Sequence, residues 1–314
     1  MTTADRAPAL ELRRFRGALL GLAAGDALGT TAEFQPPGSF PPVTDMIGGG
    51  VFRLEPGQWT DDTSMALCLA ESLLQSGGFD PADQLERYRR WFREGYWSST
   101  GDCFDIGNAV RGAVMRFERT GDGWSGSDDP MQAGNGSIMR LVPAVLFEAG
   151  IPEKAIGYAE QSSRTTHAAP ECLDACRLMA AILLGALHGW SKEELLREDA
   201  FDRWLGAKPL TPRIEDIRRG SYKLKQPPAI KGTGYVVDSL EAALWAFAGS
   251  NSFEEGALLA VNLGDDADTT GAVYGQIAGA YYGEAGIPSR WLQLLARGED
   301  IRELADGLYR HATA

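Results

Sequence analysis

Apolar residues recur at helical spacing along most of this chain. Between residues 11 and 28 they include Leu12, Phe15 and Leu19, which share one face of a helix with 3.6 residues per turn. A second apolar run, over residues 272–282, predicts a helix that is buried on all sides. The same periodicity predicts helices over residues 65–75, 81–92, 108–118, 138–148, 152–163, 169–188, 191–198, 239–248, 253–262, 288–296 and 299–310.

Strand signals are nearly absent. The one β-branched cluster, residues 235–237, is too short to build a sheet, and no low-complexity linker divides the chain. Residues 34–58 are rich in Pro and Gly and predict a long ordered loop. We therefore expect an all-α, compact, single-domain many-helix bundle over residues 11–314, with a flexible tail at residues 1–10.

Two predicted helices carry glycine at every fourth position. A glycine inside a helix costs about 1 kcal/mol relative to alanine, so two such stripes indicate close contact between backbones. If the two helices cross antiparallel, the end of the first lies near the start of the second, and Glu33 comes close to Asp266 and Asp268. The glycines are at positions 17, 21, 25 and 29 and at positions 271, 275, 279 and 283.

Composition narrows the class of protein. Hydrophobic residues make up 44% of the 314, enough for a large core, and no apolar run is long enough to span a membrane. A net charge of −13 argues against a nucleic-acid partner, because phosphates require basic residues. No cysteine pair has CxxC spacing and no apolar segment opens the chain, so we expect a reducing, cytoplasmic location.

Aspartates crowd two predicted helix starts. Asp265, Asp266 and Asp268 precede one buried helix, and Asp61 and Asp62, which follow a threonine, precede another. Helix capping explains one acidic residue at such a place, but three repel one another and need a cation. Because the chain has only three histidines, we expect oxygen ligands and hence Mg²⁺ or Mn²⁺, with two ions about 3.5–4 Å apart as the arrangement that activates a water.

A glycine-containing loop precedes the helix predicted from residue 138. Such loops present backbone N–H groups to anions, usually phosphate, although many have no ligand. Arg140 either adds a positive charge there or is a solvated side chain. His167 alone is more often a capping or core residue than a ligand, and Asp105 and Asn108 have about even odds of being simple helix caps. Trp97, Tyr235 and Trp245 lie near glycine loops; we expect most of them to be core residues, with one as a candidate to stack on an adenine.

Taken together, the motifs resemble the ADP-ribosylglycohydrolase family over about residues 14–285. The resemblance is greatest to the bacterial dinitrogenase-reductase-activating glycohydrolase branch. The motifs that carry it are Gly25-Asp26-Ala27-Leu28-Gly29 with Glu33, Trp59-Thr60-Asp61-Asp62-Thr63, Asp102-Cys103-Phe104-Asp105-Ile106-Gly107-Asn108, Gly134-Asn135-Gly136-Ser137-Ile138-Met139-Arg140, Thr166-His167 and Asn262-Leu263-Gly264-Asp265-Asp266-Ala267-Asp268-Thr269-Thr270.

This resemblance implies an all-α fold, a binuclear Mg²⁺ or Mn²⁺ centre and removal of ADP-ribose from modified proteins, by cleavage of the N-glycosidic bond to arginine in this branch. The implied metal ligands are Thr60, Asp61, Asp62, Asp266, Asp268 and Thr269. The candidate substrate contacts are Asp105, Asn108, Gly134, Asn135, Gly136, Ser137, Met139, His167 and Tyr235.

For catalysis we expect Asp61 or Asp62 to accept the proton of the attacking water, with Glu33 beside the site. The acid that protonates the leaving guanidine cannot be named from the sequence. Asp265 lies outside the Asp-x-Asp-Thr pattern of Asp266 and Asp268, so we expect it to point away from the metals or to support their ligands.

Other readings stay open. The linkage could be to serine or O-acetyl-ADP-ribose, or the protein could bind ADP-ribose without cleaving it. An α-helical isoprenoid synthase needs Asp-Asp-x-x-Asp, but Asp61-Asp62 is followed by Thr63, Ser64 and Met65. A phosphohydrolase of the His-Asp type is also disfavoured, because the chain contains no His-Asp dipeptide.

Overall fold

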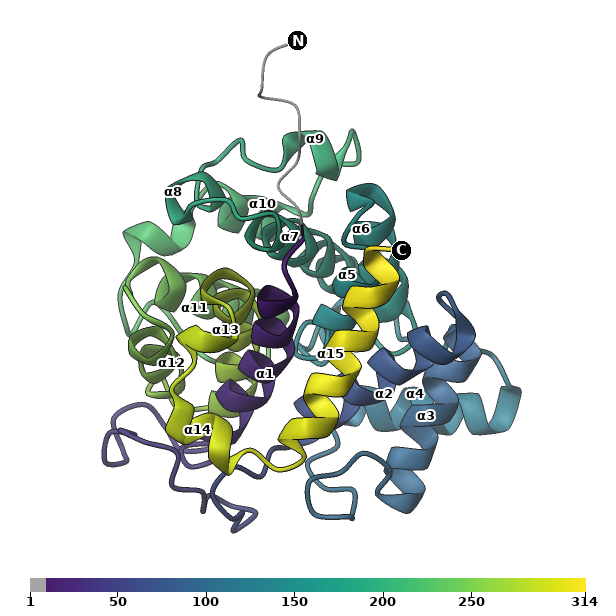
Figure 1. Ribbon diagram of the computed structural model, residues 1–314, viewed down its shortest axis with the longest axis horizontal. Coiled ribbons are helices and arrows are strands. Elements are labelled where there is room, and N and C mark those ends of the chain that lie inside the picture. Colours follow the sequence, from purple (N-terminus) through teal and green to yellow (C-terminus); the bar gives the residue numbers. More distant parts are fainter. Residues whose placement is uncertain (1–9) are drawn as a thin grey trace.

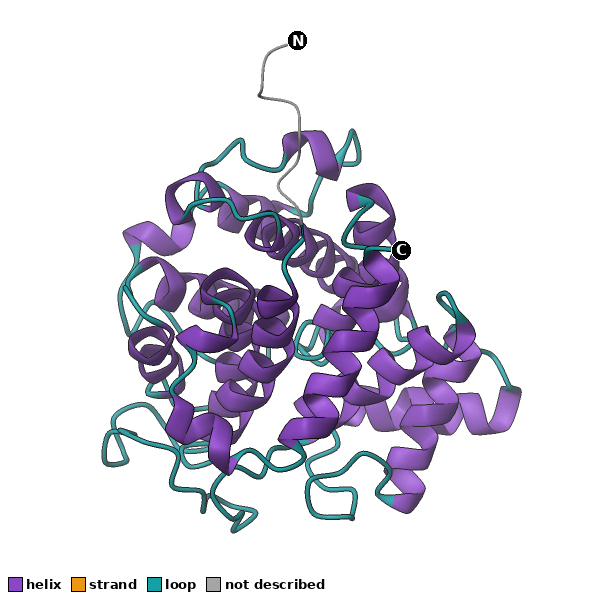
Figure 2. Ribbon diagram, viewed as in Figure 1, coloured by secondary structure: helices purple, strands orange, loops and turns teal. Residues whose placement is uncertain are grey.

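The computed structural model describes residues 10–314 (Figures 1 and 2). Within this range helices are joined by loops, and the only β-type pairings are three isolated bridges. The predicted all-α class is confirmed. The predicted tail lies, apart from residue 10, outside the described residues.

Helices α1 (Leu12–Gly29) and α13 (Ala267–Tyr282) form the centre of the molecule and cross antiparallel through their glycines (Figure 1). A Cβ atom added to Gly25 would lie 2.0 Å from the carbonyl oxygen of Gly271, and one on Gly275 would lie 1.9 Å from that of Gly21. No side chain fits at such distances, so the predicted glycine seam is confirmed.

The other helices surround this pair. The main hydrophobic core extends from Phe15 to Leu308, and a smaller one contains residues between Met65 and Met139. Against α13 pack α7 (Pro170–Leu187), α11 (Val236–Ala248) and α12 (Phe253–Val261). Against α1 pack α15 (Gly298–Ala312) and α2 (Asp61–Ser76), with α5 (Val142–Phe147) behind them.

The remaining helices lie further from the central pair. On the α2 side are α3 (Pro81–Glu94) and α4 (Asn108–Thr120), and α6 (Pro152–Arg164) packs on α7. Short elements complete the chain, namely α8 (Lys192–Leu195), α9 (Asp202–Leu205), α10 (Pro212–Arg218), α14 (Ser289–Leu294), η1 (Pro130–Gln132), η2 (Ser221–Leu224) and η3 (Glu284–Gly286).

Some predicted boundaries are wrong. The helix predicted from residue 138 begins only at Val142, where Pro143 is accepted in the first turn and the Gln276 side chain takes up the Val142 N–H at 2.9 Å. Helix α11 begins at Val236, three residues before its predicted start, and Tyr235 is its extended N-cap residue. Helices α9 and α10 were not predicted, because four and seven residues are too few to show a helical period.

The long loop between α1 and α2 lies at the lower edge of Figure 1, below the ends of α1 and α13. The Asn262 side chain bonds the backbone N–H and carbonyl of Val43 at 2.8 and 2.9 Å, which fixes the loop to the end of α12. The loop is ordered, as predicted. Among the helices of residues 10–314, none is both long and apolar enough to cross a membrane.

Candidate active site

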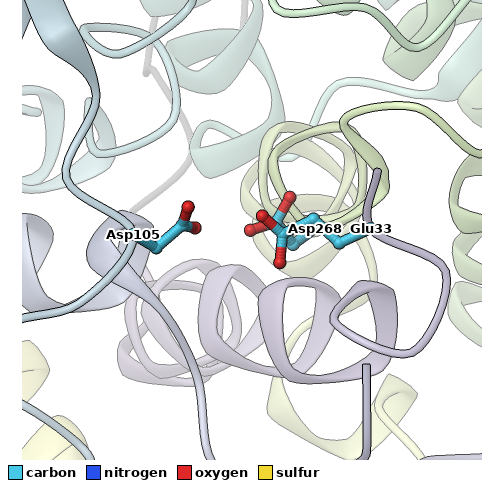
Figure 3. A group of neighbouring side chains, drawn as sticks. All are labelled: Glu33, Asp105 and Asp268. Carbon is cyan, nitrogen blue, oxygen red and sulfur yellow. The ribbon is translucent and has the colours of Figure 1, made fainter. Parts of the chain in front are cut away.

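The glycine seam brings acidic groups from distant parts of the sequence together. A Cβ atom on Gly29 would lie 2.4 Å from the Ala267 carbonyl oxygen, so α1 ends directly against the start of α13. Figure 3 shows the carboxylates of Glu33, Asp105 and Asp268 pointing toward one another, and one oxygen of each lies within 4.8 Å of the others. The predicted approach of Glu33 to Asp268 is therefore confirmed.

A carboxylate on α1 caps the start of α2. Asp26 is fully buried, and its two oxygens accept hydrogen bonds from the backbone N–H groups of Thr60 and Thr63, at 2.9 and 3.0 Å. The Thr63 hydroxyl also donates to it, at 2.6 Å, and the Thr60 hydroxyl oxygen lies 3.0 Å from it. Asp26 thus satisfies N–H groups that a capping residue on α2 would otherwise take.

Because Asp26 caps α2, the Thr60 side chain makes no capping bond and faces the acidic cluster instead. Its hydroxyl oxygen lies 3.0 Å from Asp26, 3.3 Å from Asp62 and 3.1 Å from Asp268. A hydroxyl has one proton, so it can satisfy only one of these three carboxylates at a time. Thr60 therefore occupies the N-cap position of α2 without capping the helix through its side chain.

Several buried carboxylate oxygens have no hydrogen-bond partner, namely Glu33 Oε2, Asp62 Oδ1 and Asp268 Oδ1. No Lys or Arg of residues 10–314 forms an ion pair with this cluster. Buried, unpaired carboxylates of this kind are what a divalent cation requires as ligands. The donor set therefore fits the predicted oxygen-ligated metal.

Burial and mutual repulsion favour protonation of these acids when no cation is bound. Burial, with the charges of Asp105 and Asp266, raises the pKa of Glu33 to about 10, and burial raises the pKa of Asp105 to about 7. The pKa values of Asp61, Asp62 and Asp268 are raised well above their usual range, again mainly by burial.

A cavity of about 350 Å³ opens above the acidic cluster. Its acidic end carries five of the predicted site residues, Glu33, Asp61, Asp105, Asp266 and Thr269. Its other end carries six more, Asn108, Gly134, Asn135, Gly136, Met139 and His167. The structure thus joins the two predicted constellations in one cavity, and Asn135 Nδ2 links them by donating to Asp266 Oδ2 at 2.7 Å.

Other predicted residues do not line this cavity. Thr60, Asp62 and Asp268 are buried beneath its acidic end. Ser137 is fully buried, with its hydroxyl 3.5 Å from Cys176 Sγ. Tyr235 lines an adjoining cavity together with Asn108 and Gly134, and its hydroxyl bonds Glu171.

The structure also shows the surroundings of Arg140 and Asp265, for each of which the sequence left two alternatives. Arg140 is fully buried, so the solvated alternative is wrong; its guanidinium donates to the carbonyl oxygen of Gly136 at 2.7 Å. Asp265 lines a separate cavity with Leu258 and Trp245, which agrees with its expected direction away from the cluster.

Sequence reasoning missed Asp26 as a structural partner and Phe34 as a lining residue. Asp26 had a signal, because an aspartate inside an apolar, glycine-striped helix needs buried partners. Phe34 had none, since its place depends on a positive φ of 58° directly after Glu33. Ile106, Gly107, Ala109 and Val110 at the start of α4, with Gly234, also line the cavity unpredicted.

Comparisons with known proteins agree with this geometry. A family model described as ADP-ribosylglycohydrolase matches residues 7–314. ADP-ribosylarginine hydrolase Tri1 of Pseudomonas putida (strain GB-1) is 47% identical over 305 residues, covering 97% of this chain and 80% of that protein. The ADP-ribosyl-(dinitrogen reductase) glycohydrolase of Rhodospirillum rubrum is 35% identical over 301 residues, covering 94% and 95%.

A solved structure described as an ADP-ribosylglycohydrolase-related protein complex superposes with a TM-score of 0.85. It is 48% identical in sequence and covers 96% of this chain and 98% of its own. The family match spans both the acidic cluster and the glycine loop. The chain belongs to the ADP-ribosylglycohydrolase family.

Proposed function

We propose that this protein is a metal-dependent hydrolase that removes ADP-ribose from modified arginine side chains of proteins and releases free ADP-ribose. The observation that carries the proposal is the single cavity with unpaired carboxylates at one end and a glycine loop with His167 at the other. Relatives named for ADP-ribosylarginine hydrolysis, at 47% and 44% identity, support the arginine linkage.

The ligand set proposed for two cations, Mg²⁺ or Mn²⁺, is Thr60, Asp61, Asp62, Asp266, Asp268 and Thr269. Such cations, when bound, would neutralise the carboxylates and acidify a water. The unpartnered oxygens of Asp62 and Asp268 support this assignment. Asp105 and Glu33 lie close enough to Asp268 to take part.

The two ends of the cavity would bind different parts of the substrate. The glycine loop and His167 would bind the diphosphate and adjacent ribose, which leaves the distal ribose against the carboxylates. Asp61 faces the cavity whereas Asp62 does not, so Asp61 is our choice for the base that accepts the proton of the attacking water.

Glu33 is our choice for the acid that protonates the leaving guanidine. It lines the cavity beside the carboxylates, at the end where the guanidine would leave. The four cysteines are free thiols, which is compatible with the cytoplasmic location that we propose.

A hydrolysis panel tests the function. Wild-type protein is incubated with ADP-ribose linked to arginine, ADP-ribose linked to serine, or O-acetyl-ADP-ribose, each with Mg²⁺, Mn²⁺ or a chelator. We expect release from arginine that depends on the cation and is abolished in Asp61→Ala and Asp266→Ala, with helical circular dichroism unchanged. Full activity in both variants would refute the metal-hydrolysis proposal. ADP-ribose binding in calorimetry without any hydrolysis would indicate a reader instead.

A further inference from the structure

His167 lies beneath the glycine loop with its two ring nitrogens in different surroundings. The side chain is 3% exposed and lines the cavity. A Cβ atom placed on Gly136 or Gly134 would lie 3.1 or 3.5 Å from Nε2, so this nitrogen lies directly against both glycines. The other nitrogen, Nδ1, lies 2.8 Å from the Thr166 hydroxyl oxygen, away from the cavity.

Arg140 determines the direction of the bond between Thr166 and His167. Its guanidinium donates to the Thr166 hydroxyl oxygen at 2.6 Å, and a guanidinium has no acceptor. The hydroxyl therefore accepts from Arg140 and keeps one proton to donate. Within residues 10–314 the other hydrogen-bond partner of this hydroxyl is His167 Nδ1. If the hydroxyl did not donate to Nδ1, its buried proton would have no acceptor.

The ring can then carry its proton only on the cavity side. Burial, and the nearby charge of Arg140, lower the pKa of His167 to about 3, so the imidazole is neutral at physiological pH. A neutral imidazole has one N–H group. With Nδ1 accepting from Thr166, that N–H is at Nε2.

We propose that Arg140 and Thr166 form a positioning pair that holds His167 in the Nε2–H tautomer, so that an oxygen of the ligand in the glycine loop meets a neutral hydrogen-bond donor. The same guanidinium bonds the Gly136 carbonyl at 2.7 Å, which fixes the loop and the ring relative to each other. The N–H of Gly136 donates to no acceptor of the described residues and is a second donor for the ligand.

The positioning of His167 by Arg140 and Thr166 predicts how the affinity of the protein for ADP-ribose depends on pH. A histidine that gained a proton near pH 6 would bind a diphosphate more tightly in acid. His167 stays neutral, so its contribution to ADP-ribose binding is constant between about pH 5 and about pH 8. The identity of the ligand as ADP-ribose rests on the proposed function, whereas the tautomer does not.

The test combines nitrogen NMR of the cation-free protein with ADP-ribose binding. The chain has three histidines, which makes assignment by His188→Gln and His311→Gln direct. We expect wild type and Thr166→Ser to show a protonated Nε2 and an unprotonated Nδ1 at His167, unchanged with pH. Thr166→Val, which keeps the shape without the hydroxyl, is expected to lose this NMR signature and to bind ADP-ribose about 10-fold more weakly. In hydrolysis assays this variant is expected to raise KM more than it lowers kcat.

A proton on Nδ1 in the wild type would overturn the proposal, and so would unchanged affinity in Thr166→Val. Should Thr166→Val not fold, the wild-type spectrum and the rescue by Thr166→Ser still decide. A wild-type protein that shows the Nε2–H tautomer but hydrolyses no ADP-ribosyl linkage would overturn the proposed function alone.

A second inference concerns Phe34, at the acidic end of the cavity. The residue is 60% exposed, and it has a positive φ of 58°, a conformation that is unfavourable for a residue with a side chain. Two backbone hydrogen bonds hold it there: Phe34 donates to the Asp265 carbonyl at 2.6 Å, and Asp265 donates to that of Gln35 at 2.8 Å. The backbone thus fixes an exposed aromatic ring at the mouth of the site.

Phe34 belongs to an aromatic rim. Its ring centroid is 6.4 Å from that of Phe52, and Phe52 is 5.1 Å from Phe104, the residue before Asp105. With the diphosphate in the glycine loop, the group bonded to the distal ribose leaves at this acidic end. We infer that the Phe34 ring binds the planar guanidinium of the modified arginine, because aromatic faces attract such cations. This inference deepens the proposed function and rests on it.

Substitutions at Phe34 test this role. Phe34→Leu is expected to lower kcat/KM for ADP-ribosylated arginine about 5-fold, mainly by raising KM, while Phe34→Tyr stays near wild type. The affinity for free ADP-ribose should not change, and Val51→Ala, at an exposed position that does not line the cavity, is the matched control. Wild-type kinetics in Phe34→Leu, or an equal loss for free ADP-ribose, would contradict the inference. Inactivity of the wild type on every linkage would contradict the proposed function instead.

Discussion

Two buried charged regions of this protein are built in opposite ways. Arg140 is fully buried, and both terminal nitrogens of its guanidinium donate to the protein, to the Gly136 and Ser162 carbonyls and the Thr166 hydroxyl; only its Nε lacks a partner. The carboxylates of Asp62 and Asp268 are buried equally deeply, but each keeps an oxygen without a partner and lies among other acidic groups that repel it. A charge surrounded by groups of opposite polarity stabilises the fold, whereas charges of one sign crowded together are available to a ligand.

The largest expected effect is that of Asp268→Asn. Changing a partner of a metal ligand typically lowers activity about 10–100-fold, and we expect more than about 100-fold for a proposed ligand itself. The cation-free variant should be at least as stable as wild type, because asparagine is neutral at every pH, whereas the buried Asp268 must take up a proton to be neutral. Steady-state hydrolysis and denaturant unfolding measure the two effects.

The control for this variant is Asp265→Asn, three residues earlier and in a separate cavity, where we expect less than about 3-fold loss of activity. If Asp268→Asn destabilised the cation-free protein strongly, the acidic cluster would be a structural network like that of Arg140, and the contrast would fail.

Arg140→Met should have the next largest effect and the opposite sign on stability. It leaves the carbonyls of Gly136 and Ser162 without their donor, which we expect to lower the free energy of unfolding by about 2–3 kcal/mol. Chemical denaturation with and without ADP-ribose measures it. An unchanged midpoint would show that the guanidinium does not hold the loop.

The stability of the cation-free protein should fall as pH rises. Burial raises the pKa of Asp26 to about 6, of Asp105 to about 7 and of Glu33 to about 10, so the folded protein holds protons that the unfolded chain releases. Stability is then greatest below the unfolded values near pH 4 and is lost as pH rises through the folded ones.

Thermal unfolding between about pH 5.5 and about pH 8 measures this slope. We expect Tm to fall across the range without cation, and Mn²⁺ to raise Tm more at the upper end, where more carboxylates are charged. Glu33→Gln should flatten the slope. A Tm that rises with pH in the cation-free protein would mean that these acids are paired within the protein.

The smallest expected effect is that of Tyr88→Phe. The ring stays over the Arg140 guanidinium, 4.8 Å away, and only the hydroxyl that accepts from Gln84 at 2.8 Å is lost. We expect a loss of less than about 1 kcal/mol in unfolding free energy, against about 1–2 kcal/mol for Tyr88→Leu. Equal losses in both variants would assign the role to the hydroxyl rather than to the ring.

Much of the site was predictable because its signals lie within short stretches of the sequence. The aspartates at the starts of α2 and α13 place more negative charge there than helix capping explains, and the glycine loop has the composition of an anion site. The approach of Glu33 to Asp268 was predicted on the condition that the two glycine-striped helices are antiparallel, because a glycine at every fourth position predicts close contact but not direction. The single-domain organisation and the individual ligand roles stay predictions.

Other features depended on where distant segments meet. Nothing near Thr60 shows that Asp26 of α1 caps α2 and frees the threonine hydroxyl. Nothing near Arg140 shows that it is buried, because an arginine beside a glycine loop is equally compatible with solvent. The short helices α9 and α10 escaped prediction because their few residues carry no period.

The sequence by itself determined the all-α class and the close contact of the two glycine-striped helices, because periodicity and sterics act over one helix, and its crowded charges indicated the candidate site residues. Only the tertiary structure decided that the two helices are antiparallel, which carboxylates keep unpartnered oxygens, which face the cavity, and which groups the two nitrogens of His167 contact. Those properties depend on hydrogen-bond partners and burial supplied by segments more than a hundred residues away in some cases, such as Thr60 with Asp268.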